Sequence, residues 1–185
     1  MDKWALDVEL IKSNRAYFYE TVTAMFIHFS YKHLAGNLIF AFFIMYEIEA
    51  CWRWGIVVGL VAGFAANAMA IATMEGLLMG FSGVLCACVG IELAALILHC
   101  SFLQERYGPQ FYMMFFFLIL LVFMIIGITN AALVHLFGLL YGILFGLTFY
   151  PRMPEVNINA NVDKLFKIFS ALFLGLAILL GLVVW

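Results

Sequence analysis

Charged side chains are scarce in this chain of 185 residues: Asp, Glu, Lys and Arg together make up 11% of it. Soluble domains usually carry about 25% charged residues. Because 67% of the residues are hydrophobic, the chain cannot cover itself with a polar surface. We therefore expect an integral membrane protein surrounded by membrane lipids. The net charge of −2 gives no indication of a nucleic-acid partner, and an even split of Lys and Arg between the two faces leaves the membrane and the orientation open.

The N-terminus lacks the long apolar core of a cleavable signal peptide. Its first residues carry charges of both signs, so 1–30 is predicted to be an interfacial segment lying on the membrane surface. Proline is also scarce, and two of the 3 prolines lie in 151–164. Together with several polar residues, these prolines predict that 151–164 is a loop.

Long apolar runs define the architecture, because a membrane-spanning helix needs about 20 mostly apolar residues. The connections between the runs are short, apart from the 151–164 loop. The sequence thus predicts an all-α, polytopic membrane protein with a compact helical core at 31–150 and an additional C-terminal transmembrane helix at 165–185. The six expected helices are 33–50, 55–73, 81–100, 110–128, 131–149 and 165–185.

Cysteine is too sparse and too poorly spaced to predict a metal site. The 4 cysteines show no metal-ligand spacing with a histidine. On a helix, Cys86 and Cys88 point about 200° apart, so one metal ion cannot easily bind both. We interpret the cysteines as small apolar residues, and no metal is predicted.

Four polar side chains occur where lipid should disfavour them. His33 and Asn37 begin the first expected helix, Ser82 begins the third and His135 begins the fifth. These three helices start from the same face of the membrane. At a rise of 1.5 Å per residue, the four side chains fall within roughly 10 Å of one surface, so we expect them to converge there.

Small residues form a stripe on two of these helices, which allows close approach of their backbones. His135 is in register with one stripe, and Ser82 lies beside the other. Packing one stripe against the other would bring the imidazole to the hydroxyl. The glycines of the two stripes are Gly138, Gly142, Gly146, Gly83 and Gly90.

A serine hydroxyl becomes a good nucleophile when a neighbouring base takes its proton. His135 is the candidate base for Ser82, and the unpaired N–H groups at the start of a helix could hold an oxyanion together with Asn37 and His33. No carboxylate is placed to orient His135, so the prediction is a dyad. The alternative for each residue alone is helix packing or capping.

Three segments together resemble the rhomboid family of intramembrane serine proteases. "TAMFIHFSYKHLAGNLIF" resembles the family's histidine followed by H-x-x-x-N, and "GFSGVLCACVG" resembles its G-x-S-G motif. "NAALVHLFGLLYG" resembles its H-x-x-G-x-x-x-G helix. The resemblance covers about residues 20–150.

This resemblance implies a rhomboid-like fold and cleavage of transmembrane protein substrates within or beside the membrane, with no cofactor. By position, Ser82 would be the nucleophile and His135 the general base. His33 and Asn37 would be oxyanion donors, and Gly80 would belong to the loop before the serine. His28 matches a further family histidine.

The chain departs from the family pattern at several points. Glu20 lies about where an arginine is usual, and Cys86 replaces an aromatic residue that stacks on the catalytic histidine. No span is apparent before the first expected helix. These departures favour an alternative, in which the chain is a catalytically inactive scaffold or a subunit that binds partner membrane subunits.

Glu92 falls in the middle of the third expected helix, where an unpaired carboxylate is expensive. We expect it to be protonated and hydrogen-bonded to a neighbouring helix, for instance to Asn67. A wet cavity and a polar group of a partner subunit are the alternatives.

Overall fold

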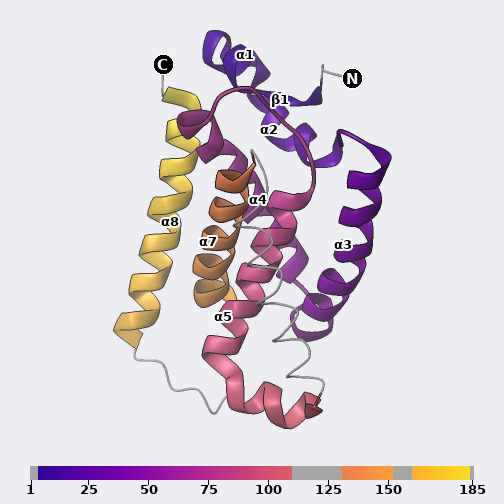
Figure 1. Ribbon diagram of the computed structural model, residues 1–185. Coiled ribbons are helices and arrows are strands. Elements are labelled where there is room, and N and C mark those ends of the chain that lie inside the picture. Colours follow the sequence, from indigo (N-terminus) through magenta and orange to yellow (C-terminus); the bar gives the residue numbers. More distant parts are fainter. Residues whose placement is uncertain (1–3, 110–130, 152–159, 184–185) are drawn as a thin grey trace.

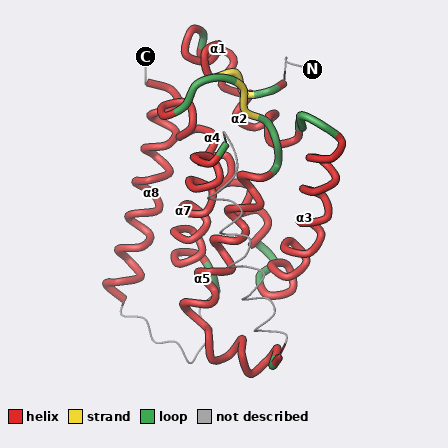
Figure 2. The backbone as a smooth tube through the Cα atoms, in the orientation of Figure 1, coloured by secondary structure: helices red, strands yellow, loops and turns green. Residues whose placement is uncertain are grey.

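The computed structural model describes residues 4–109, 131–151 and 160–183, and most of them are helical. This confirms the all-α, polytopic prediction (Figures 1 and 2). The long helices are α3 (Tyr31–Cys51), α4 (Gly55–Thr73), α5 (Ser82–Tyr107), α7 (Ala132–Phe149) and α8 (Ala160–Val183).

Within the described ranges, 3 helical stretches are long and apolar enough to cross a membrane, namely Gly55–Thr73, Ser82–Ser101 and Ala132–Phe149. Helices α3 and α8 lie where the sequence predicted two further spans, and α8 contains a shorter apolar stretch at Lys167–Leu179. The helix predicted at 110–128 lies outside the described residues.

Helices α3, α5 and α7 begin at the same end of the molecule, as Figure 1 shows. The N-terminal elements cover that end. They are β1 (Leu6–Asp7), α1 (Val8–Ser13), a 3-10 turn at Arg15–Tyr19, α2 (Glu20–Thr23) and a second 3-10 turn at Ala24–Phe26.

Helix α5 continues past its predicted end at residue 100 because a kink redirects it. His99 has non-helical dihedral angles (φ −138°, ψ 28°) inside the helix. Its Nε2 lies 3.0 Å from the carbonyl oxygen of Pro151, so it is placed to donate a hydrogen bond to the chain that follows α7. This contact ties the far end of α5 to the end of α7.

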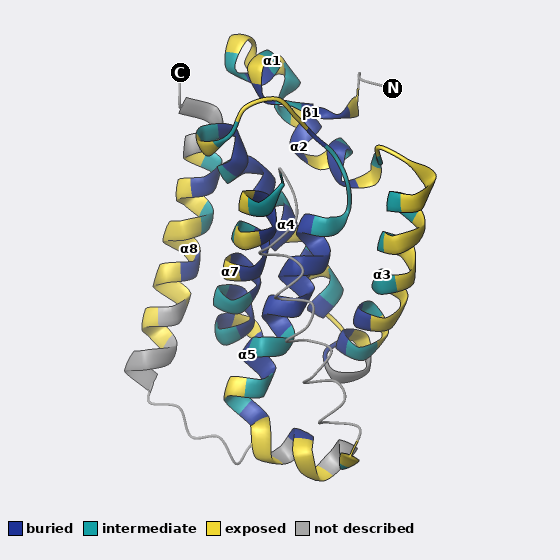
Figure 3. Ribbon diagram, in the orientation of Figure 1, coloured by how far each residue is buried: buried dark blue, intermediate teal, exposed yellow. Residues whose placement is uncertain are grey.

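Helices α4, α5 and α7 form the core, and α3 and α8 flank it with largely exposed outer faces (Figure 3). A membrane protein keeps apolar side chains on such faces, because lipid tails are as apolar as the side chains themselves. The exposed apolar residues of the two flanking helices include Leu38, Ile39, Phe42, Phe43, Leu172 and Leu179.

The closest helix pair is α5 with α7, and glycines make the approach possible. A Cβ atom on Gly142 would collide with the carbonyl of Ala87, and one on Gly138 would collide with the carbonyl of Gly83. In the other direction, a Cβ on Gly90 would strike the carbonyl of Leu139. The two backbones are therefore in direct contact along the predicted stripes. A Cβ on Gly146 would lie 2.5 Å from the Cβ of Ala94, so small residues meet there as well.

The N-terminal segment contains a strand that the sequence analysis did not foresee. β1 pairs antiparallel with β2 (Leu77–Leu78), which lies in the loop between α4 and α5. We call this loop, residues 74–81, the serine loop because it leads directly into Ser82. The N-terminal segment is thus attached to the core by backbone hydrogen bonds.

Glu20 is 1% exposed, although it occupies a position where the family resemblance implied a basic residue. Its Oε2 accepts a hydrogen bond of 3.0 Å from the backbone N–H of Asp7. Burial raises the pKa of Glu20 above the ordinary 4.5, and the nearby Asp7 charge adds to this, whereas the hydrogen bond from Asp7 acts in the opposite direction.

The expected contact between Glu92 and Asn67 is wrong. The Asn67 side chain donates a hydrogen bond of 2.8 Å to the carbonyl oxygen of Thr21, towards the end of α4 that the N-terminal elements cover. Glu92 instead shares a side-chain hydrogen bond with Glu47 of α3. The general prediction that Glu92 bonds to a neighbouring helix therefore stands with a different partner.

We predict that Gly142→Ala destabilises the protein, because its new methyl group would force α5 and α7 apart. Overpacking of this kind costs about 1–3 kcal/mol. Gly175→Ala in α8 is the matched control, because a Cβ there meets nothing within 4 Å, and we expect it to cause no loss of stability. Unfolding in a denaturing detergent series measures both variants, and equal stabilities would contradict the packing argument.

Glu20 gives the folded protein a pH dependence of known sign. Since its pKa is raised in the folded state, its contribution to stability is complete below its ordinary pKa of 4.5 and is lost as the pH rises through the folded pKa. As the pH rises from 4.5 through the folded pKa, the unfolding temperature of the wild type should therefore fall relative to that of Glu20→Gln, whose residue 20 does not titrate. Two parallel curves would show that Glu20 titrates alike in both states.

Candidate active site

Ser82 and His135 meet at the end of the helical core that the N-terminal elements cover. Ser82 is the first residue of α5, and His135 lies in the first turn of α7. His135 Nε2 and Ser82 Oγ are 2.7 Å apart, which is hydrogen-bonding distance. The ring is buried and 9% exposed, whereas Ser82 is half-buried. The arrangement matches what a base and a nucleophile require.

The start of α5 places backbone N–H groups beside Ser82, because the first turn of a helix has N–H groups without intrahelical partners. Phe81 is the N-cap residue, and its side chain makes no capping bond to them. Such donors, together with the positive end of the helix dipole, favour a negative charge beside the serine.

His33 and Asn37 lie against the serine loop from the side of α3. Helix α3 begins at Tyr31 because Ser30 Oγ accepts a hydrogen bond of 3.2 Å from the N–H of His33. Asn37 Nδ2 is 3.4 Å from His33 Nε2. Both side chains lie close to Gly80, since a Cβ on that glycine would lie 2.7 Å from His33 Cε1 and 3.7 Å from Asn37 Nδ2.

Gly80 can approach His33 so closely only because it is glycine. Its φ of +129° belongs to a region that other residues rarely adopt. The conformation turns the serine loop into α5, and the missing side chain leaves room for the His33 ring. The motif therefore requires glycine at this position for steric reasons.

His28 holds the residue immediately before the serine. The N–H of Phe81 donates a hydrogen bond of 3.4 Å to His28 Nε2, so this nitrogen must be unprotonated. Burial lowers the pKa of His28 below 6.5, and the neighbouring His33 adds to this, whereas a backbone hydrogen bond with Phe26 opposes it. A neutral His28 is therefore the form that supports the serine loop.

The sequence analysis missed the backbone contacts that fix the serine loop. Besides the bond to His28, the N–H of Gly80 donates to the carbonyl oxygen of Ala24 at 2.9 Å. A backbone acceptor carries no residue signature, so no sequence motif could have marked Ala24. In the part of the chain that the structure describes, His, Cys, Asp and Glu side chains do not gather in any group of three that could hold a metal ion.

The fold and the site together define a polytopic helical membrane protein with a Ser–His pair at one end of its core. The Rhomboid domain matches residues 15–152, which is most of the chain. The protein belongs to the rhomboid family, whose members are generally intramembrane serine proteases. No match was found among curated proteins.

We predict that Gly80→Ala sharply lowers the reactivity of Ser82 towards a fluorophosphonate probe, because a methyl group would strain the loop and displace His33. Misplacement of a catalytic group by about 1 Å can cost about 100-fold in rate. Gly108→Ala is the matched control, since Gly108 also has a positive φ of +51° but has no neighbour within 4 Å. Labelling of Ser82 by a fluorophosphonate probe measures the effect, and an equal loss in both variants would implicate general backbone strain.

Proposed function

We propose that the protein is an intramembrane serine protease that hydrolyses peptide bonds within or beside a transmembrane helix of its substrate. The observation that carries this proposal is the 2.7 Å distance between Ser82 Oγ and His135 Nε2. Membership of a family of intramembrane serine proteases supports it. Neither a metal nor an organic cofactor is needed for this chemistry.

The reaction begins when His135 Nε2 takes the proton of Ser82 and the Oγ attacks the substrate carbonyl carbon. For Nε2 to accept this proton, the neutral imidazole must carry its own proton on Nδ1. The carbonyl oxygen becomes an oxyanion, which the first-turn N–H groups of α5 and the Asn37 amide stabilise. Each such donor is worth roughly 3 kcal/mol in the transition state.

Collapse of the tetrahedral intermediate releases the first product. The protonated His135 gives its proton to the leaving amine as the C–N bond breaks, which leaves an acyl group on Ser82 Oγ. Water then attacks the ester as His135 takes one of its protons, and His135 returns this proton to Ser82 Oγ as the acyl C–O bond breaks and the carboxylic acid product leaves. His33 is a second side-chain donor to the oxyanion, beside Asn37, because its ring lies over the loop that leads into the serine.

The position of the site suits a reaction that needs both water and a membrane-embedded substrate. Ser82 and His135 lie in the first turns of their helices, close to one surface of the expected bilayer. Water can reach the serine from that surface, while a transmembrane substrate approaches through lipid. This explains why the polar groups gather at one end of an otherwise apolar core.

We predict that Ser82→Ala and His135→Ala each reduce cleavage of a model transmembrane substrate by at least about 1,000-fold. Both should also abolish labelling by a fluorophosphonate probe. Ser101→Ala is the matched control, because Ser101 is an exposed serine at the other end of α5, and it should keep full activity.

Retention of cleavage by Ser82→Ala would refute the mechanism. A wild-type protein that shows neither cleavage nor labelling but co-purifies with membrane partners would instead favour the scaffold alternative.

A further inference from the structure

The serine loop is held along its whole length by the N-terminal part of the chain. Lys12 Nζ donates a hydrogen bond of 3.3 Å to the carbonyl oxygen of Met74. The N–H of Val8 donates one of 3.2 Å to the carbonyl oxygen of Gly76. Further along, β1 pairs with β2, and Gly80 and Phe81 are held by Ala24 and His28. A chain of contacts therefore runs from the end of α4 to Ser82.

The hydrogen bonds of β1 point in two directions. In an antiparallel pair, successive residues of a strand face the partner strand and then away from it. Val8 lies opposite Gly76 and bonds to it, so the N–H of Asp7 points away from β2. Glu20 Oε2 accepts that N–H at 3.0 Å. The strand is thus fixed between the serine loop on one side and a buried carboxyl group on the other.

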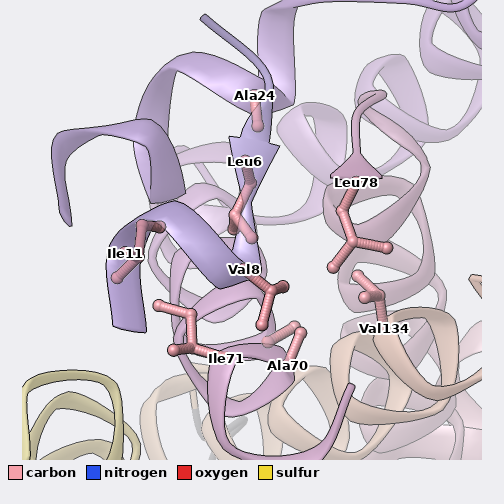
Figure 4. Close-up of a cluster of buried hydrophobic side chains, with 9 residues drawn as sticks. Leu6, Val8, Ile11, Ala24, Ala70, Ile71, Leu78 and Val134 are labelled. Atoms are coloured by element: carbon pink, nitrogen blue, oxygen red, sulfur yellow. The ribbon is translucent and has the colours of Figure 1, made fainter. Parts of the chain in front are cut away.

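The side chains of this region connect the same strand to both residues of the dyad. Leu6, Val8 and Ile11 are at most 2% exposed and belong to one apolar cluster. Leu78 of the serine loop and Val134 of α7 are members of that cluster and lie side by side (Figure 4). Val134 directly precedes His135, and Leu78 lies four residues before Ser82. The strand therefore packs against an apolar cluster to which both the serine loop and α7 contribute.

We propose that β1, together with Val8 that directly follows it at the start of α1, is a positioning element for the catalytic serine: the backbone bond from Val8 to Gly76 fixes the serine loop and so sets the alignment of Ser82 with His135. Val8 and Glu20 are the positioning residues, Val8 through its N–H and Glu20 through its bond to Asp7. The proposal rests on the proposed protease function. It assigns a role in turnover to a segment that the motifs of the active site do not include.

Val8→Pro tests this role with little local disturbance. Val8 is the first residue of α1, a position that proline favours, and Asp7 before it is extended (φ −95°, ψ 102°), as a residue before proline should be. The substitution removes the N–H that bonds to Gly76 and keeps an apolar side chain. Val8→Ala is the matched control, because it shrinks the side chain but keeps the N–H.

We predict that Val8→Pro lowers kcat for a model transmembrane substrate by about 10- to 100-fold and leaves KM within about twofold. Hydrogen exchange at the amides of residues 76–81 should become faster in the same variant. Val8→Ala leaves a small cavity in the apolar cluster but keeps the N–H, so it should affect kcat and exchange clearly less than Val8→Pro does. Faster exchange with an unchanged kcat, or equal effects in the two variants, would overturn the proposal.

A second pair of variants keeps the test valid if Val8→Pro does not fold. Glu20→Gln retains an acceptor for the N–H of Asp7 and should keep kcat near that of the wild type, whereas Glu20→Ala should lower kcat and speed exchange in the serine loop. Equal values of kcat in these two variants would overturn the proposal. If the wild type itself is inactive, the proposed protease function fails, and the exchange rates alone decide whether β1 orders the loop.

Discussion

The site depends on the direct contact of two helix backbones. Serine and histidine have short side chains, so an Oγ and a ring nitrogen on different helices reach 2.7 Å only if the helices almost touch. The structure achieves this at Gly138 and Gly142, whose missing Cβ atoms make room for carbonyl oxygens of α5. In lipid, helices gain little from hydrophobic association and pack chiefly through van der Waals contact, which favours small residues. The same glycines therefore serve the stability of the fold and the close approach of Ser82 to His135.

A second constraint comes from the non-helical backbone that precedes the serine. Backbone N–H and C=O groups outside helices lack intrahelical partners and must find other partners. The serine loop finds them in the N-terminal elements, at Val8, Ala24 and His28. A segment that is remote from Ser82 in sequence thus completes the hydrogen bonding of the loop that leads into this serine. The same bonds that make the loop compatible with its surroundings also restrict where Ser82 can lie.

Much of the fold and the central pair of the site were accessible from the sequence for simple physical reasons. Apolar runs of about 20 residues specify helices, and the alternation of direction along the chain places Ser82 and His135 at one end. The remaining features depend on groups that leave no pattern. The strand β1 has only 2 residues, which is too short for a period-two signal. Ala24 acts through its carbonyl oxygen, and the kink at His99 depends on a contact with Pro151, 52 positions away along the chain.

The error over Glu92 shows how far such reasoning extends. A carboxyl group near the middle of a membrane helix requires a partner, and that inference holds, since Glu92 shares a hydrogen bond with Glu47. Asn67 was the plausible partner because an amide can bond to a carboxyl group in either protonation state. The Asn67 amide instead donates a hydrogen bond to the carbonyl oxygen of Thr21, towards the end of α4 that the N-terminal elements cover. The cost of burying a carboxylate thus predicts that Glu92 has a partner, whereas the packing of α3 on α5 determines that this partner is Glu47.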